Sequence, residues 1–133
     1  MATRERPLSP HLQVYSWQIT MVMSILHRAT GVALTVGAFG LAWWLVSMAT
    51  GGETAARAMA CVSSPIGMVL VFGFSVALVY HFLNGIRHLA WDLGYGFDKK
   101  LAERNSVIII ALSIVLALLI FGASWTGHGG YLR

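Results

Sequence analysis

Long apolar runs separated by short polar segments dominate the chain. Three segments lack Asp, Glu, Lys and Arg for about 20 residues or more, the length that a helix needs to cross a bilayer core. With their flanking turns they predict transmembrane helices over about 20–49, 62–90 and 106–126. Gly51-Gly52 and Gly94-Tyr95-Gly96 separate these helices, and Pro65 stands near the start of the second, where a first turn tolerates proline. The pattern predicts an all-α, membrane-embedded bundle of three transmembrane helices, in a single domain over residues 1–133.

The composition agrees with a membrane protein and excludes several functions. Of the 133 residues, 57% are hydrophobic and only 11% are charged, whereas soluble domains contain about 25% charged residues. The net charge of +4 comes from basic residues that flank the apolar runs, so we expect contact with membrane lipid and not with nucleic acid. Cys61 is the single cysteine, so the chain cannot hold an iron–sulfur cluster. No glycine-rich dinucleotide fingerprint follows a strand-like segment, so another chain must deliver any electrons that pass through this one.

The distribution of basic residues predicts the orientation of the helices. On one side lie Arg4, Arg6, Arg28, Arg87, Lys99, Lys100 and Arg104. Only Arg57 and Arg133 fall on the other side. Because positive charge favours the cytoplasmic or matrix face, we expect an inner N-terminus, an inner-face segment over residues 1–19, and an outer C-terminus. Tryptophans at both interfaces agree with this orientation, and they are Trp17 and Trp91 inside and Trp43, Trp44 and Trp125 outside.

Histidines inside a membrane-length helix are the first candidates for chemistry. His81 and His88 are seven residues apart in the second predicted helix, so they share one side of it, about 10 Å apart along the axis. Histidine nitrogens find no water in hydrocarbon, so His81, the deeper of the two, needs a partner. It could ligate haem iron, with its second nitrogen donating a hydrogen bond, or it could bond to a neighbouring helix. For His88, a surface position near lipid headgroups is the alternative to a place in the same site.

Ser24 and Arg28 form a second candidate site at the inner end of the first predicted helix. They are four residues apart and share one helix face. The hydroxyl can donate a hydrogen bond to a quinone carbonyl, and the guanidinium can stabilise the negative charge that develops on reduction. The alternative is that Arg28 reaches lipid phosphate while Ser24 bonds to a carbonyl of its own helix.

Membrane depth connects these candidates. The first helix leaves the inner face and the second returns to it, so the inner half of the membrane contains Ser24, His27, Arg28, His81 and His88. Histidines and an arginine gathered in one leaflet indicate a site. Depth would permit His27 and His81 to ligate one haem, but the position of His27 beside Arg28 favours a second ligand from another chain.

The remaining polar residues have simpler interpretations. Asp92 and Asp98 lie among Arg87 and two lysines, which predicts pairing at a solvated surface. A proton relay through Asp92 from the inner face is the alternative. Cys61 has no metal-ligand neighbours in the sequence and is interpreted as a packing residue.

Three stretches of sequence carry a resemblance to a known family. They are Arg6-Pro7-Leu8-Ser9-Pro10-His11-Leu12, then Ser24-Ile25-Leu26-His27-Arg28-Ala29-Thr30-Gly31, and then His81-Phe82-Leu83-Asn84-Gly85-Ile86-Arg87-His88 with Trp91-Asp92-Leu93-Gly94. Together they resemble the cytochrome b membrane-anchor subunits of succinate dehydrogenase, respiratory complex II. The resemblance covers nearly the whole chain, and the second and third stretches together are specific.

The resemblance implies an electron-transfer subunit that is not catalytic alone. In this family a flavoprotein subunit oxidises succinate, an iron–sulfur subunit passes the electrons on, and two three-helix anchors hold a b-type haem beside the site of ubiquinone reduction. Matched by motif, His81 corresponds to the axial haem ligand of this chain, and the second anchor supplies the other. Ser24 and Arg28 correspond to the quinone-site residues. His27, Arg28 and His88 correspond to the haem vicinity, with His27 near the propionates.

Two alternatives to this function stay open. One is an anchor of fumarate reductase, which runs the electrons in the opposite direction. The other is a structural anchor that binds no haem and uses its histidines for packing. Residues 1–18 contain no apolar core of signal-peptide length, so we expect the first membrane helix to act as the insertion signal. The absence of a presequence favours a multi-pass protein of a bacterial inner membrane over a mitochondrial one.

Overall fold

Helices account for nearly all of the described chain. The computed structural model describes residues 16–128, with side chains as far as Ala123. Its elements are α1 (Ile19–Thr50), α2 (Gly52–Ser63), α3 (Pro65–Asp92) and α4 (Lys99–His128). Residues 16–128 contain no strand. In α1, α3 and the Lys99–Ala123 part of α4, length and composition suffice to cross a membrane, so the all-α fold with three transmembrane helices is confirmed.

The orientation of these helices in the membrane stays a prediction. Arg4 and Arg6, two of the basic residues on which it depends, lie outside the described residues. The first fifteen residues of the predicted inner-face segment and the side chain of Trp125 also lie outside the described part of the chain.

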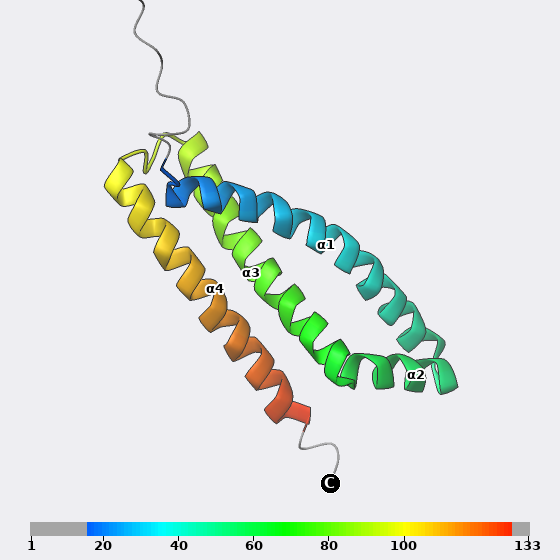
Figure 1. Ribbon diagram of the computed structural model, residues 1–133. Coiled ribbons are helices and arrows are strands. Elements are labelled where there is room, and N and C mark those ends of the chain that lie inside the picture. Colours follow the sequence, from blue (N-terminus) through cyan, green and yellow to red (C-terminus); the bar gives the residue numbers. More distant parts are fainter. Residues whose placement is uncertain (1–15, 129–133) are drawn as a thin grey trace, which may run out of the picture.

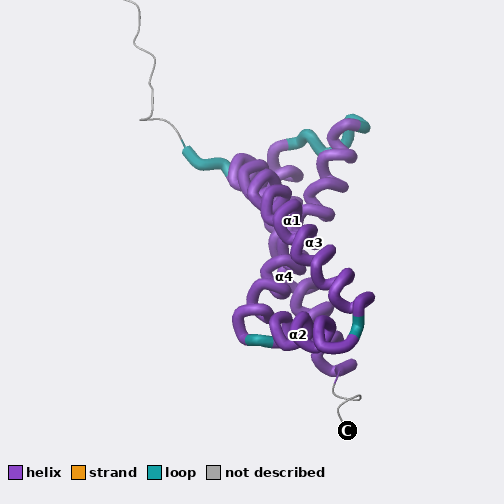
Figure 2. Tube along the Cα trace, turned by 90° about the vertical axis from the view of Figure 1, so that its right-hand side faces the viewer, coloured by secondary structure: helices purple, strands orange, loops and turns teal. Residues whose placement is uncertain are grey.

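The helix α3 runs through the middle of the bundle (Figure 1). It contacts both α1 and α4. α1 crosses α3 near the α3–α4 turn and diverges from it toward the other end, where α2 bridges the two helices. Figure 2 shows that the non-helical connections gather at the two ends of the bundle. The crossing of α1 and α3 therefore brings together the two helices that carry the candidate site residues.

Glycines set the positions at which the chain turns. Gly51 and Gly52 have φ values of 73° and 56°, and Gly94 and Gly96 have values of 87° and 83°. Side chains rarely tolerate this left-handed region, which glycine adopts at no steric cost. The predicted breaks at both glycine pairs are confirmed.

Side-chain caps begin the two helices that follow the turns. The Ser64 hydroxyl accepts a hydrogen bond from the Gly67 N–H at 3.1 Å, and Pro65 occupies the first turn of α3. The Asp98 carboxylate accepts from the Leu101 N–H at 3.0 Å at the start of α4. Both caps satisfy helix N–H groups that have no intrahelical partner. Asp98 thus stabilises a helix end, which the sequence analysis did not anticipate.

The short helix α2 is a feature that the hydrophobic pattern did not predict. Alanines favour a helix here, and Glu53 and Arg57 form an ion pair of 2.6 Å one turn apart. At 12 residues, α2 is far shorter than the roughly 20 residues that cross a bilayer. It ends because Ser64 precedes Pro65 and adopts an extended conformation, with ψ at 155°.

Small residues on α1 let α3 approach closely. A Cβ atom added to Gly37 would collide with the Phe74 ring, and one added to Gly31 would lie 3.1 Å from Cε1 of His81. Gly40 and Gly73, in contrast, face open space. Glycines at contact positions permit tight helix packing in membranes. Gly31 therefore positions a candidate site residue, whereas Gly37 serves packing alone.

Candidate functional site

Three histidines from two helices form one cluster at the crossing of α1 and α3. The ring of His27 on α1 stacks on that of His81 on α3, with centroids 3.9 Å apart and planes inclined by 9°. His88, two turns further along α3, lies 5.1 Å from His27. The structure thus brings together three of the predicted site residues and places His27 between the other two.

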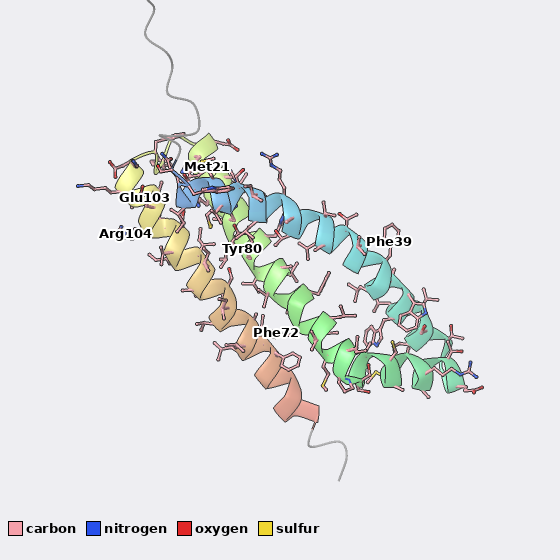
Figure 3. The ribbon with its side chains drawn as sticks, in the orientation of Figure 1. Met21, Phe39, Phe72, Tyr80, Glu103 and Arg104 are labelled. Carbon is pink, nitrogen blue, oxygen red and sulfur yellow. The ribbon has the colours of Figure 1, made fainter. Side chains whose placement is uncertain are left out.

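A tyrosine hydrogen bond fixes the crossing beside this cluster. Tyr80 is buried, and its hydroxyl donates to the backbone carbonyl of Met23 at 2.8 Å. Figure 3 shows Tyr80 pointing toward the start of α1. Because Tyr80 precedes His81, and Met23 lies one turn before His27, this bond holds the two helices in register at the site.

Hydrogen bonds to Nδ1 determine the tautomer of His81. This atom lies 3.1 Å from the His27 carbonyl oxygen and 3.2 Å from Oγ1 of Thr30. A carbonyl only accepts hydrogen bonds, so Nδ1 carries the proton and the neutral ring presents the lone pair of Nε2. The Thr30 hydroxyl is 2.8 Å from the Leu26 carbonyl, to which it donates. Its oxygen is therefore free to accept from His81. His81 thus forms the hydrogen bond to a neighbouring helix that the alternative predicted, and its Nε2 is still available to ligate a metal.

Ser24 and Arg28 keep their polar groups available to a ligand. Ser24 is partly buried, and its hydroxyl forms no hydrogen bond within the described residues. Other side-chain hydroxyls in the apolar helices, such as those of Thr35 and Ser75, donate to a carbonyl one turn earlier in the same helix at 2.9 Å. The hydrogen bond of Ser24 to its own helix is therefore not formed in the described residues. Arg28 is exposed and forms no ion pair in the part of the chain that the structure describes.

His88 lies inside the bundle end and not on an open surface. It is partly buried, its Nε2 lies 3.4 Å from the amide nitrogen of the buried Asn84, and its ring meets Trp91 edge-on at 5.2 Å. The amide N–H donates, so Nε2 accepts this bond. Nε2 of His88 is thus engaged within the chain.

Arg87 is a buried residue that the sequence analysis placed at the surface. It is only 7% exposed, and its Nη1 donates to Oγ of Ser106 at 3.0 Å. Its guanidinium carbon lies 4.2 Å above the Trp91 ring, a favourable cation–π distance. Among the described residues the one ion pair is between Glu53 and Arg57, so the predicted pairing of the aspartates with Arg87 is not formed. The polar Asn84 and Arg87, three residues apart on α3, were the signal for a buried face.

The histidine cluster offers single donors and no closed metal site. The described residues contain no group of three or more His, Cys, Asp or Glu arranged to hold a metal ion. Instead, the His27 and His81 rings stack face to face. Nδ1 of His27 is buried without a hydrogen-bond partner, and such polar atoms require one. The cluster thus presents one oriented lone pair, at His81, and one unsatisfied nitrogen, at His27.

Comparison with known proteins identifies the family. The sequence profile of the succinate dehydrogenase/fumarate reductase transmembrane subunits matches residues 2–120. The chain belongs to this family. The resemblance inferred from the sequence motifs is therefore confirmed, and the chain is a multi-pass membrane protein.

Individual relatives agree with the family assignment. The succinate dehydrogenase cytochrome b556 subunit of Paracoccus denitrificans is 45% identical over 114 residues, which cover 86% of this chain and 88% of the relative. The subunit of the same name from Rickettsia felis is 40% identical over 117 residues, 88% of this chain and 91% of the relative. The mitochondrial succinate dehydrogenase cytochrome b560 subunit of Bos taurus is 37% identical over 115 residues, 85% of this chain and 68% of the relative.

Proposed function

We propose that the chain is the haem b- and quinone-binding anchor of a succinate dehydrogenase, in a bacterial inner membrane with the N-terminus inside. Family membership makes it a membrane subunit of an oxidoreductase complex. The single cysteine fits a subunit that receives electrons from an iron–sulfur partner, which a flavoprotein partner reduces. The relatives carry the name of succinate dehydrogenase, which favours this direction over that of fumarate reductase.

The orientation of His81 is the observation that carries the haem proposal. Its protonated Nδ1 bonds to the His27 carbonyl at 3.1 Å, which leaves Nε2 as a ligand atom. The residues fit a haem in a second way, because the unpaired Nδ1 of His27 can donate to the acidic groups of the macrocycle. The other ligand to the iron would come from a second anchor subunit, since Nε2 of His88 contacts the Asn84 amide within the chain. The haem, when bound, supplies a one-electron redox centre.

Ser24 and Arg28 perform the binding steps of quinone reduction. The Ser24 hydroxyl, which has no partner in the described chain, donates a hydrogen bond to one quinone carbonyl oxygen. The permanently charged Arg28 side chain stabilises the negative charge that this oxygen gains as electrons arrive. Two electrons and two protons then convert the quinone to the quinol. Groups from the partner subunits complete the pocket.

The experiment is to purify the complete complex from membranes and record its optical and electron paramagnetic resonance spectra. Succinate oxidation is measured with ubiquinone and, separately, with a soluble dye that takes electrons before the anchor. We expect a low-spin b-type haem with two histidine ligands and quinone-linked activity. An intact complex without haem would support the structural-anchor alternative. Faster fumarate reduction by a quinol than succinate oxidation by a quinone would support the fumarate reductase alternative.

A further inference from the structure

A cavity between α3, α4 and their connecting turn adjoins the histidine cluster at Trp91, whose ring meets that of His88 at 5.2 Å. It has a volume of about 420 Å³. Arg87 and Trp91 from α3, Tyr95 from the turn and Asn105 from α4 contribute its polar and aromatic groups. Neither Ser24, Arg28 nor any of the three clustered histidines lines it. The cavity is therefore lined by residues other than those assigned to haem and quinone.

The charge of Arg87 has no counterion within the described chain. Arg87 is only 7% exposed, and its Nε and Nη2 atoms are buried without a hydrogen-bond partner. No carboxylate of the described residues lies within ion-pair distance of it. An unpaired buried charge is costly, and the cost rises at membrane depth. Nη1 bonds to Ser106 and Asn84, and the guanidinium lies over the Trp91 ring, but Nε and Nη2 are left without a partner, so the side chain can still bind an anion from outside the chain.

The walls of the cavity define the chemistry of that anion. Leu83, Ile86 and Ile108 make the walls aliphatic, and Ile86 and Ile108 continue onto the outer surface, where they are 49% and 50% exposed. Trp91 and Tyr95 stand where the helices meet the turn, as aromatic residues do at the level of lipid headgroups. A molecule with an anionic head and a hydrocarbon tail would match the Arg87 end of the cavity with its head and the aliphatic walls with its tail.

Further basic residues beside the cavity favour the same occupant. Lys99 and Lys100 begin α4, and Arg104 follows one turn later. All three are exposed. With Arg87 they give four positive charges against the three negative charges of Asp92, Asp98 and Glu103, so this end of the bundle carries an excess of one positive charge. Basic pockets between transmembrane helices bind anionic lipid headgroups for this reason.

We propose that this cavity binds an anionic phospholipid of the adjacent leaflet. Its phosphate lies at Arg87 and Asn105, and one acyl chain follows Ile86 and Ile108. Because Nε and Nη2 of Arg87 are closed off from solvent, binding includes a shift of the guanidinium from the Trp91 ring toward the cavity. The lipid thus supplies the counterion that α3 and α4 lack.

The test uses the purified complex, exchanged into detergent and reconstituted in vesicles that contain a photoactivatable phosphatidylglycerol. A matched set contains photoactivatable phosphatidylcholine, and crosslinked residues are mapped by mass spectrometry. We expect phosphatidylglycerol to label α3 and α4 around Ile86 and Ile108, and phosphatidylcholine to label them about tenfold less, as a lost charge-assisted contact implies. Excess inorganic phosphate should leave the labelling unchanged. Equal labelling by both lipids, or displacement by phosphate, would overturn the proposal.

Three variants locate the interaction. Arg87→Gln removes the charge. Ala90→Phe fills the cavity but keeps the Arg87 charge, so it tests the proposal even if the Arg87→Gln complex does not assemble. We expect each to lower phosphatidylglycerol labelling about tenfold. Arg104→Gln, the matched control, removes an exposed charge outside the cavity and should change labelling less than about fivefold. Wild-type labelling in Ala90→Phe would contradict a lipid occupant of the cavity.

Discussion

The two interfaces of α3, with α4 and with α1, differ in which polar atoms are hydrogen-bonded within the chain. Toward α4, Nη1 of Arg87 bonds to Ser106, and the Ser106 hydroxyl donates to the Ala102 carbonyl at 2.8 Å. Toward α1, Nδ1 of His81 is bonded within the chain while Nε2 is left as an acceptor, and the Ser24 hydroxyl is unpartnered in the described residues. Since water is absent from the bilayer core, the α1 side needs a ligand that the chain does not contain. The α4 side bonds Nη1 of Arg87 to a neighbouring helix, and what it lacks is a counterion for that guanidinium.

Changes at the quinone-binding residues should have the largest effect on function. Arg28→Ala should slow ubiquinone reduction about a hundredfold, the usual loss when a charge-stabilising group is removed. Ser24→Ala should slow it about tenfold, because a single hydrogen bond is lost. Rates with ubiquinone and with a soluble dye are measured on the same complex, and the dye rate should not change.

A serine on α3 provides the matched control for Ser24. Ser75 donates to the Val71 carbonyl at 2.9 Å, so Ser75→Ala should leave both rates unchanged. If Ser75→Ala slowed quinone reduction as much as Ser24→Ala, an unpartnered hydroxyl would have no special role. Parallel loss of the dye and quinone rates in Arg28→Ala would indicate misassembly.

Overpacking behind the ligand should disturb the haem. Gly31→Val places a side chain against the His81 ring, where even a Cβ atom would lie 3.1 Å from Cε1. Such overpacking costs about 1–3 kcal/mol, so we expect a clear loss of haem per complex, measured from the optical spectrum. Gly40→Val is the control on the same helix, since Gly40 meets nothing within 4 Å. Equal haem content in both variants would show that Gly31 does not position His81.

Substitutions in the α3–α4 interface should lower the stability of the complex and leave its haem content unchanged. Ser106→Ala removes the acceptor that is 3.0 Å from Nη1 of Arg87 and should destabilise the subunit by about 1–3 kcal/mol. The midpoint of thermal unfolding of the complex should fall, with an unchanged haem spectrum. Ser113 is also buried but bonds only to the Ile109 carbonyl, so Ser113→Ala should have the smaller effect. A haem loss in Ser106→Ala would mean that the two interfaces are not separable.

The smallest effect is expected at Thr30. Thr30→Val removes one acceptor of the His81 Nδ1 proton, while the His27 carbonyl at 3.1 Å remains. We expect haem retention during dilution to weaken by less than about tenfold, at the low end for the loss of a group that orients a ligand. Thr35 donates to its own helix at 2.9 Å, and Thr35→Val should retain haem like the wild type. A full loss of haem in Thr30→Val would show that the His27 carbonyl alone cannot orient the ring.

Local signals explain what the sequence could predict. Three apolar runs and two glycine pairs are properties of short segments, so the three membrane helices and their turns followed from them. Equal membrane depth also placed His27, His81 and His88 together. α2 escaped prediction because its small residues are neither apolar enough to cross a membrane nor polar enough to indicate a loop.

The contacts that the sequence did not predict depend on how the helices cross. The burial of Arg87 is caused by α4, whose Ser106 is 19 residues away, and hydropathy treats such an arginine as a surface charge. The stack of His27 on His81 and the role of Thr30 depend on the register of α1 against α3, which the Tyr80 bond to Met23 sets. No spacing along the chain encodes these contacts.

The most direct test of the central claim is the haem spectrum of the complex that carries His81→Ala. If Nε2 of His81 ligates the iron, the low-spin signal with two histidine ligands must disappear from an otherwise assembled complex, while succinate oxidation by a soluble dye continues. The matched variant His88→Ala should retain a low-spin haem, because Nε2 of His88 faces Asn84. An unchanged low-spin spectrum in His81→Ala would contradict the account.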